Sequence, residues 1–172
     1  MPPGGWGSSA RKSGPGRSAP GPRTSTSCGN DKGGMIGLRF FQLPNGATLS
    51  YAEYGTAEGR PVLLFHGLVG SICSEGMEEQ LQGLPLRVIA LARPGYGASD
   101  YFDMDCIADW GRLLDGFFEH LNIQRCDIVG ISAGAPYAYS LAALYPDRID
   151  TLYIHSGMPA VCLPNVLVQY PS

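Results

Sequence analysis

A chain of 172 residues is long enough for one domain, and its 44% hydrophobic content is ordinary for a protein with a packed core. The formal net charge is -3 although residues 1–34 are basic, so the rest of the chain is acidic, which argues against nucleic acid as the main partner. No apolar run approaches the roughly 18 residues of a membrane span, and no hydrophobic signal-peptide core lies near the N-terminus.

The sequence contains five cysteines, an odd number, and no two of them have C-x-x-C spacing. They are Cys28, Cys73, Cys106, Cys126 and Cys162. We therefore expect reduced thiols in a cytoplasmic protein, without a disulfide framework or a metal site. Nothing in the sequence predicts a cofactor.

Residues 1–34 are rich in Gly, Pro and Ser and contain little that is apolar. Such a segment buries too little surface to offset the entropy lost on ordering, so we expect a disordered tail. Its basic, acid-poor composition has a faint likeness to an organelle transit peptide, but it lacks an amphipathic apolar stripe, which favours a plain tail.

Residues 35–157 contain all the regular elements that we predict. Two strands, 38–43 and 47–54, flank the turn signal Pro44-Asn45-Gly46 and form an antiparallel hairpin. The apolar run 61–65 is typical of a strand covered on both faces, and it ends in His66-Gly67-Leu68.

The middle of the chain predicts a helix over 75–84, a buried strand over 86–91 and a stiff loop over 93–100. The clearest helix is predicted over 105–121, because apolar residues recur there at intervals of three and four. Asp103 or Asp105 is expected to cap its start. His120 is expected at the surface or at the end of this helix.

The last third predicts a strand over 127–129, a helix over 136–144 and a strand over 149–154. Residues 158–172 contain three prolines and show no clear element. Strands that alternate with helices imply an α/β fold: a mostly parallel sheet with helices on both faces, preceded by the antiparallel hairpin. Functional sites in such sheets lie at the carboxyl ends of the strands.

Gly130, Ser132 and Gly134 have the spacing G-x-S-x-G between a predicted strand and a predicted helix. A strand that turns abruptly into a helix presents the residue at the bend, so we expect strained backbone and a raised hydroxyl at Ser132. A side chain at position 130 or 134 would collide with the facing strand or helix. The alternative is a Gly/Ser-rich loop without chemistry.

Taken together, four motifs make the chain resemble the alpha/beta-hydrolase superfamily over roughly residues 36–157. The motifs are His66-Gly67, Arg93-Pro94-Gly95-Tyr96-Gly97-Ala98-Ser99, Gly130-Ile131-Ser132-Ala133-Gly134 and Tyr145-Pro146-Asp147-Arg148. The sequence is similar to the branch that includes epoxide-hydrolase-like, haloalkane-dehalogenase-like and prolyl-iminopeptidase-like enzymes. Serine at position 132 disfavours the first two chemistries, which use an aspartate nucleophile. Ala92 departs from the family, where many relatives carry an aspartate.

The resemblance implies a role for each matching residue. Ser132 would be the nucleophile, and the backbone N–H groups of Leu68 and Ala133 would form the oxyanion hole. His66 would be a structural histidine beside this loop, with Gly67, Gly130 and Gly134 in supporting positions. Leu68, Val69 and Tyr137 could line a pocket, although core packing is the commoner role of such residues.

A serine nucleophile needs a base and a carboxylate that orients the base, in the family order Ser, acid, His. After Ser132 the only carboxylates are Asp147 and Asp150, which flank the start of a strand and are expected to be solvated turn residues. His155 is the only later histidine, but the family's base follows two further strands. We therefore expect a C-terminally truncated hydrolase in which residues 158–172 are either the start of a lid or an irregular tail.

Three functions remain open on this reading. The first is a serine hydrolase that acts on small ester or amide substrates and is weak or inactive as given, because the acid and the base are missing. The second is a non-catalytic binding or regulatory module on the same fold. The third is an enzyme completed by a partner chain, and the exposed sheet edge could also support self-association.

Overall fold

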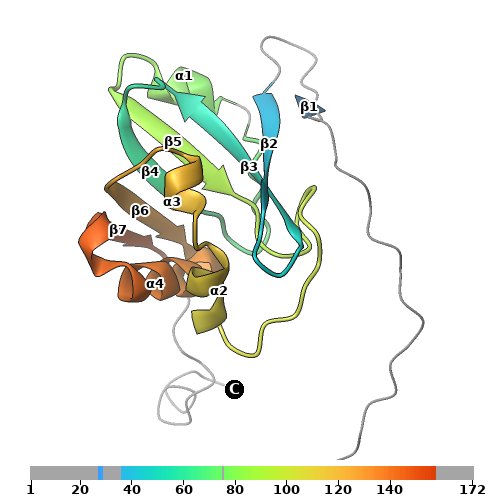
Figure 1. Cartoon of the computed structure of the whole chain (residues 1–172). Coiled ribbons are helices and arrows are strands. Elements are labelled where there is room, and N and C mark those ends of the chain that lie inside the picture. The colour runs from blue at the N-terminus through green and yellow to red at the C-terminus, as the bar shows by residue number, and fades with distance from the viewer. Residues whose placement is uncertain (1–26, 29–35, 75, 158–172) are drawn as a thin grey trace, which may run out of the picture.

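The computed structural model describes residues 27–28, 36–74 and 76–157, and these form a seven-stranded sheet in the order β1-β2-β3-β5-β4-β6-β7 (Figure 1). The strands are β1 (Ser27–Cys28), β2 (Ile36–Gln42), β3 (Thr48–Gly55), β4 (Arg60–Phe65), β5 (Leu86–Leu91), β6 (Cys126–Ile131) and β7 (Ile149–His155). Each of the six strands predicted from the sequence is present, and no end of a strand differs from the prediction by more than two residues. β1 lies inside the predicted tail, whose other residues are outside the described part.

The sheet is antiparallel on one side and parallel on the other, as predicted. β2 pairs with β3, and β3 with β5, in antiparallel fashion, whereas β5, β4, β6 and β7 are parallel neighbours. The last residues of β4 and β6, Phe65 and Ile131, therefore lie at the same edge of the sheet. The segments that follow them, His66-Gly67 and Ser132-Ala133, begin there.

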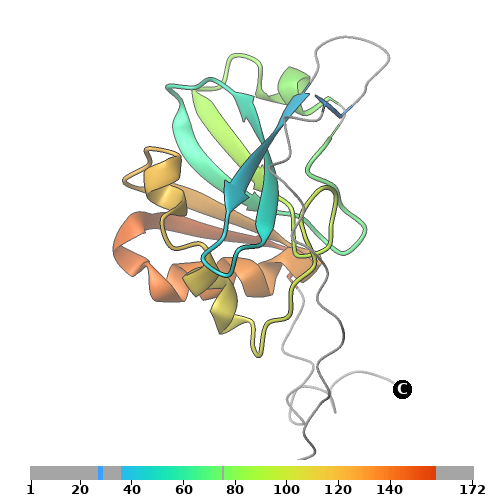
Figure 2. The same ribbon diagram turned by 45° about the vertical axis from the view of Figure 1, so that its right-hand side comes forward.

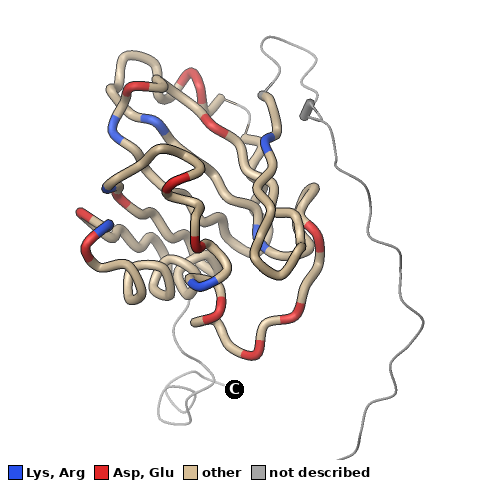
Figure 3. The backbone as a smooth tube through the Cα atoms, in the orientation of Figure 1, with Lys and Arg blue, Asp and Glu red and all other residues tan. Residues whose placement is uncertain are grey.

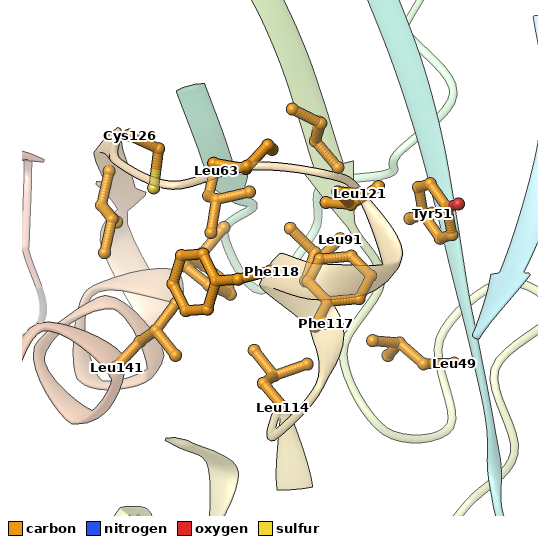
Figure 4. Packing of buried hydrophobic residues seen from close by; sticks show 14 of the residues in the cluster. Leu49, Tyr51, Leu63, Leu91, Leu114, Phe117, Phe118, Leu121, Cys126 and Leu141 are labelled. Atoms are coloured by element: carbon orange, nitrogen blue, oxygen red, sulfur yellow. The ribbon is translucent and has the colours of Figure 1, made fainter. Parts of the chain in front are cut away.

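Helices cover both faces of the sheet (Figures 1 and 2). The α-helices are α1 (Met77–Leu81), α2 (Ala108–Leu113), α3 (Phe117–His120) and α4 (Ala135–Leu144), and two short 3-10 helices are η1 (Ser132–Gly134) and η2 (Pro146–Arg148). The core on the side of α2, α3 and α4 is the larger one, and Figure 4 shows Phe117, Phe118, Leu114 and Leu141 packed over Leu63 and Leu91. The opposite face buries Ala52, Tyr54, Val88 and Ala90, with Met77 and Leu81 of α1 packed against them.

The predicted helix over 105–121 is wrong as a single element. It consists of α2 and α3, separated by Gly116 with φ +78°. The apolar spacing is real, because Trp110, Leu114, Phe117 and Phe118 are all buried, but a left-handed residue cannot continue a right-handed helix. The expected cap by Asp103 or Asp105 is also wrong, since Asp109 Oδ2 instead accepts from the Cys106 N–H at 3.1 Å.

The cysteines differ from the expectation of reduced thiols. Cys106 and Cys126 are free, but Cys73 is disulfide-bonded. Sequence spacing reports only thiols that are neighbours along the chain, whereas a disulfide needs proximity in the fold. Because disulfides are typical of oxidising compartments, this bond removes the support that the cysteines gave to a cytoplasmic location.

Several acidic residues lie along the loop between β5 and α2, where they are visible as red segments in Figure 3.

No helix in residues 27–28, 36–74 or 76–157 has the length and apolar content to cross a bilayer. The expected lid start or irregular tail at 158–172 lies outside the described residues.

Candidate active site

The bend after β6 has the strained geometry that the sequence predicts. Ser132 has φ +49°, although the preceding Ile131 is extended with φ -108° and ψ 123°. The chain then enters η1 and, from Ala135, the ten-residue helix α4. A non-glycine residue in the left-handed region is uncommon and persists only where its surroundings hold it there. Ser132 therefore lies at the beginning of a helix, where the free N–H groups favour negative charge.

Gly130 and Gly134 are required by close packing around this bend. A Cβ on Gly134 would lie 2.6 Å from the carbonyl carbon of Phe65 and 2.8 Å from the carbonyl oxygen of His66. A Cβ on Gly130 would lie 2.9 Å from the Cβ of Ala138 in α4. Neither glycine has positive φ, so the requirement is steric, which confirms the collision predicted from the sequence.

The loop after β4 is a tight turn beside Ser132. The Gly70 N–H donates to the carbonyl of Gly67 at 3.1 Å, so Leu68 and Val69 occupy the two corners of the turn. Both side chains are exposed, Val69 completely. A Cβ on Gly67 would lie 3.4 Å from the Cβ of Ser132, so the turn and the bend are in van der Waals proximity.

The turn and the bend share an open cavity of about 480 Å³. It is lined by Leu64, His66, Gly67, Leu68, Val69, Gly70, Ser71, Cys73, Ser74, Met77, Ile131 and Ser132. Of the two roles expected for these residues, Leu68 and Val69 have the less common one and line a cavity, whereas Tyr137 packs against Trp110 with ring centroids 5.2 Å apart. The sequence did not indicate Cys73, Ser74 or Met77, because residues in a connecting loop and a short helix carry no motif.

His66 is buried and neutral behind the turn. Its Nδ1 lies 2.8 Å from the Gly67 carbonyl oxygen, and since a carbonyl only accepts, Nδ1 carries the proton and donates. Burial lowers the pKa of His66; the bond to Gly67 opposes this, and the charge of Arg93 lowers the pKa further. Nε2 is buried and has no hydrogen-bond partner among the described residues, so it is not bonded to Ser132. This geometry agrees with a structural role for His66.

Arg93 joins the loop after β5 to this turn. Its Nη2 donates to the carbonyl oxygens of Gly67 at 3.0 Å and Leu68 at 3.4 Å. The guanidinium carbon lies 4.2 Å from the centroid of the Tyr96 ring, within range of a cation–π interaction. Arg93 is only 5% exposed, and its sequence motif gives no indication of these contacts.

The candidate acids after Ser132 have other contacts. Asp150, at the start of β7, pairs with Arg125 at 2.6 Å, and the Asp147 carbonyl accepts from the same arginine. Both are exposed at the amino end of β7, away from Ser132, as predicted.

Neither of the two other histidines has a hydrogen bond to Ser132 among those of the described residues. His120 ends α3, as predicted, and its Nε2 lies 2.8 Å from the Tyr51 hydroxyl. His155 ends β7 opposite Ile131 in the strand register, so it shares the edge of Ser132, but its side chain is exposed.

Comparison with known proteins places these features in context. The sequence profile of the alpha/beta hydrolase fold matches residues 60–172. An uncharacterized hydrolase of Bacillus subtilis (strain 168), YcgS, is 31% identical over 114 residues, which cover 66% of this chain and 39% of that protein.

Solved structures give the same result. A structure reported with carboxylesterases of the thaumarchaeon Nitrososphaera gargenis is 28% identical with a TM-score of 0.61, over 70% of this chain and 46% of that one. Cfl2 of Burkholderia cenocepacia is 28% identical with a TM-score of 0.60, over 75% of this chain and 44% of that one. The chain thus spans less than half the length of each of these proteins.

Proposed function

The chain belongs to the alpha/beta-hydrolase family, and from this premise we propose that it carries the nucleophile and oxyanion hole of a serine hydrolase. Ser132 Oγ bonds to the carbonyl carbon of an ester or amide while its proton passes to water, and the π electron pair of the carbonyl moves onto the carbonyl oxygen. When this pair returns, the bond to the leaving group breaks, and the alcohol or amine departs after taking a proton from water. The backbone N–H groups of Leu68 and Ala133 donate to this oxyanion. The substrate class is a small molecule with an acyl group.

One observation carries the proposal: Ser132 has left-handed backbone at the junction of β6 and α4, and it lines the same cavity as Leu68. Strained backbone is costly and is concentrated at functional sites. A strained serine between two glycines that tolerate no side chain therefore favours a catalytic role over a loop without chemistry. The likeness to a structure described with carboxylesterases favours ester substrates.

Turnover needs a base, and no histidine or carboxylate among the described residues is hydrogen-bonded to Ser132. We therefore propose that the chain as given reacts once with strong acylating or phosphonylating reagents but turns over esters weakly. A serine in an oxyanion hole keeps part of its reactivity when the other members of a triad are absent.

The second candidate function is a non-catalytic binding module. The contacts of Asp147 and Asp150 with Arg125, and the exposure of His155, favour it. In this case the cavity would hold an acyl compound without reaction.

A fluorophosphonate probe separates the two candidates, with Ser132→Ala and Ser71→Ala compared with the wild type. Ser71 lines the same cavity but accepts a hydrogen bond from the Cys73 N–H at 3.0 Å, which makes it a matched control. We expect labelling of the wild type and of Ser71→Ala, and none of Ser132→Ala. Equal labelling of all three proteins, or of none, would reject the nucleophile.

A third reading, completion of the site by a partner chain, is tested on the same samples. Light scattering gives the mass in solution, and ester turnover that rises with protein concentration would support an assembled site. A monomer with a constant specific activity would exclude it.

A further inference from the structure

The carbonyl oxygen of Gly67 accepts three hydrogen bonds. His66 Nδ1 donates at 2.8 Å, Arg93 Nη2 at 3.0 Å and the Gly70 N–H at 3.1 Å. Only the last of these donors belongs to the turn itself. The orientation of the peptide between Gly67 and Leu68 is therefore determined by side chains from two different loops.

This peptide also contains the N–H of Leu68. A trans peptide is planar, and its N–H points away from its C=O. Since the Gly67 carbonyl points toward His66 and Arg93, the Leu68 N–H points in the opposite direction, away from both side chains. Leu68 and Ser132 line the same cavity, so fixing the carbonyl fixes the direction of an amide at the candidate oxyanion hole.

Arg93 adds a charge to this arrangement. It is 5% exposed, and no ion pair joins it to a carboxylate in the described part of the chain. A buried cation is costly unless it has partners. Two carbonyl oxygens accept from Nη2, and the guanidinium carbon lies 4.2 Å from the Tyr96 ring centroid and 5.7 Å from that of Tyr137, whereas the buried Nε has no hydrogen-bond partner among the described residues. A charged donor on a carbonyl polarises the peptide, which makes the N–H of the same peptide a stronger donor.

We propose that Arg93 is a positioning residue that orients and polarises the Leu68 amide through the Gly67 carbonyl, with neutral His66 as the second side-chain donor. This inference rests on the proposed function, because it explains how one oxyanion donor of that site is prepared.

The competing explanation is that Arg93 only holds two loops together. That role predicts lower thermal stability for every substitution, with the rate of labelling following the folded fraction. The positioning role predicts slower labelling even in protein that is fully folded. The size of the decrease should depend on whether the new side chain keeps the hydrogen-bond donor and the charge of Arg93.

The test uses three substitutions of Arg93. Arg93→Met removes both the hydrogen-bond donor and the charge, Arg93→Gln keeps a neutral donor, and Arg93→Lys keeps a charged donor. Arg148→Met is the matched control, because Arg148 also donates to a carbonyl, that of Ile123, at 2.9 Å and lies 5.1 Å from the Phe118 ring centroid. For each folded variant we measure the fluorophosphonate labelling rate and the 15N resonance of the Leu68 amide.

We expect Arg93→Met to be labelled about tenfold more slowly than the wild type. This is less than the effect of removing an oxyanion donor completely, because the Leu68 N–H is still present. Arg93→Gln should be intermediate and Arg93→Lys faster than both, with the Leu68 resonance shifted in the same order. Arg148→Met should match the wild type in both measurements. If Arg93→Met does not fold, the difference between Arg93→Gln and Arg93→Lys still isolates the charge.

Unchanged labelling and an unchanged Leu68 resonance in folded Arg93 variants would overturn the inference and leave the proposed function standing. Failure of the wild type to label would instead reject the proposed function. In that case the Leu68 resonance alone decides whether Arg93 controls this amide.

Discussion

Gly134 lies against Phe65 so closely that a Cβ at position 134 would be 2.6 Å from the Phe65 carbonyl carbon. This contact joins the start of α4 to the end of β4, and so brings Ser132 beside the turn that contains Leu68. We expect Gly134→Ala to lower the free energy of unfolding by about 3 kcal/mol, because a backbone carbonyl must move to make room. Urea denaturation measures the change.

A matched control for this substitution is Gly37→Ala. No atom of the described residues lies within 4 Å of a Cβ at position 37, and the φ of Gly37 is not positive. We expect its free energy of unfolding to remain within about 0.5 kcal/mol of the wild type, as for most surface substitutions. Equal costs for the two variants would mean that the contact between Gly134 and Phe65 is not tight.

The left-handed backbone at Ser132 predicts that glycine is more stable than alanine at this position, whereas helix propensity predicts the reverse. In the left-handed region glycine is favoured over alanine by about 1 kcal/mol, whereas inside a helix alanine is favoured by a similar amount. Since Ser132 has φ +49°, we expect Ser132→Gly to be more stable than Ser132→Ala in urea denaturation. A more stable alanine variant would place residue 132 in ordinary helical backbone.

The sheet could be predicted from the sequence because each of its strands has a local signal. The run 61–65 is continuously apolar, and β4 (Arg60–Phe65) is indeed covered on both faces. The strained bend at Ser132 was predictable for the same reason, since strand, glycines and helix follow one another directly. Features that depend on distant segments could not be predicted in this way.

Arg93 and Cys73 are two such features. The partners of Arg93 are carbonyl oxygens about 25 residues earlier, and backbone carbonyls leave no mark in a sequence. The disulfide at Cys73 likewise depends on proximity in the fold rather than on spacing. The interruption between α2 and α3 was missed for another reason: the apolar spacing continues through Gly116, so periodicity alone favoured one helix.

Gly116 provides a direct test of that interruption. Its φ is +78°, and the only atom of the described residues within 4 Å of a Cβ there is the Cζ of Phe41, at 4.0 Å. A methyl group therefore has space, but the backbone is unfavourable for alanine. We expect Gly116→Ala to lower the free energy of unfolding by about 1 kcal/mol. In a continuous helix the same substitution would be stabilising by about 1 kcal/mol. The sign of the change in a urea titration therefore decides between the two structures.

The two free thiols of the described residues should differ in reactivity. Cys106 is exposed, whereas Cys126 is buried in β6, where desolvation and the charges of Asp127 and Asp150 raise its pKa to about 12. Because the thiolate is the reactive form, we expect iodoacetamide at about pH 8 to modify Cys106 and to reach Cys126 only in denaturant. Peptide mass mapping checks this, and rapid modification of Cys126 in folded protein would contradict its burial.

The lowered pKa of His66 predicts how stability changes with pH. A histidine whose pKa is lowered by folding contributes stability that is present above its ordinary pKa of about 6.5 and is lost as the pH falls through the lower, folded value. Protonated His66 would have a buried Nε2–H with no partner among the described residues, next to the cation of Arg93. The free energy of unfolding should therefore decrease on acidification from about pH 7.5 to 5.

His66→Asn separates this group from the others that titrate in the same range. The asparagine amide can still donate to the Gly67 carbonyl but does not ionise, so the decrease between the two pH values should be smaller than in the wild type. His155→Asn is the control, since His155 is exposed, and it should keep the full decrease. An identical pH dependence in wild type and His66→Asn would show that His66 is protonated without cost, and the buried, neutral histidine behind the turn would have to be abandoned.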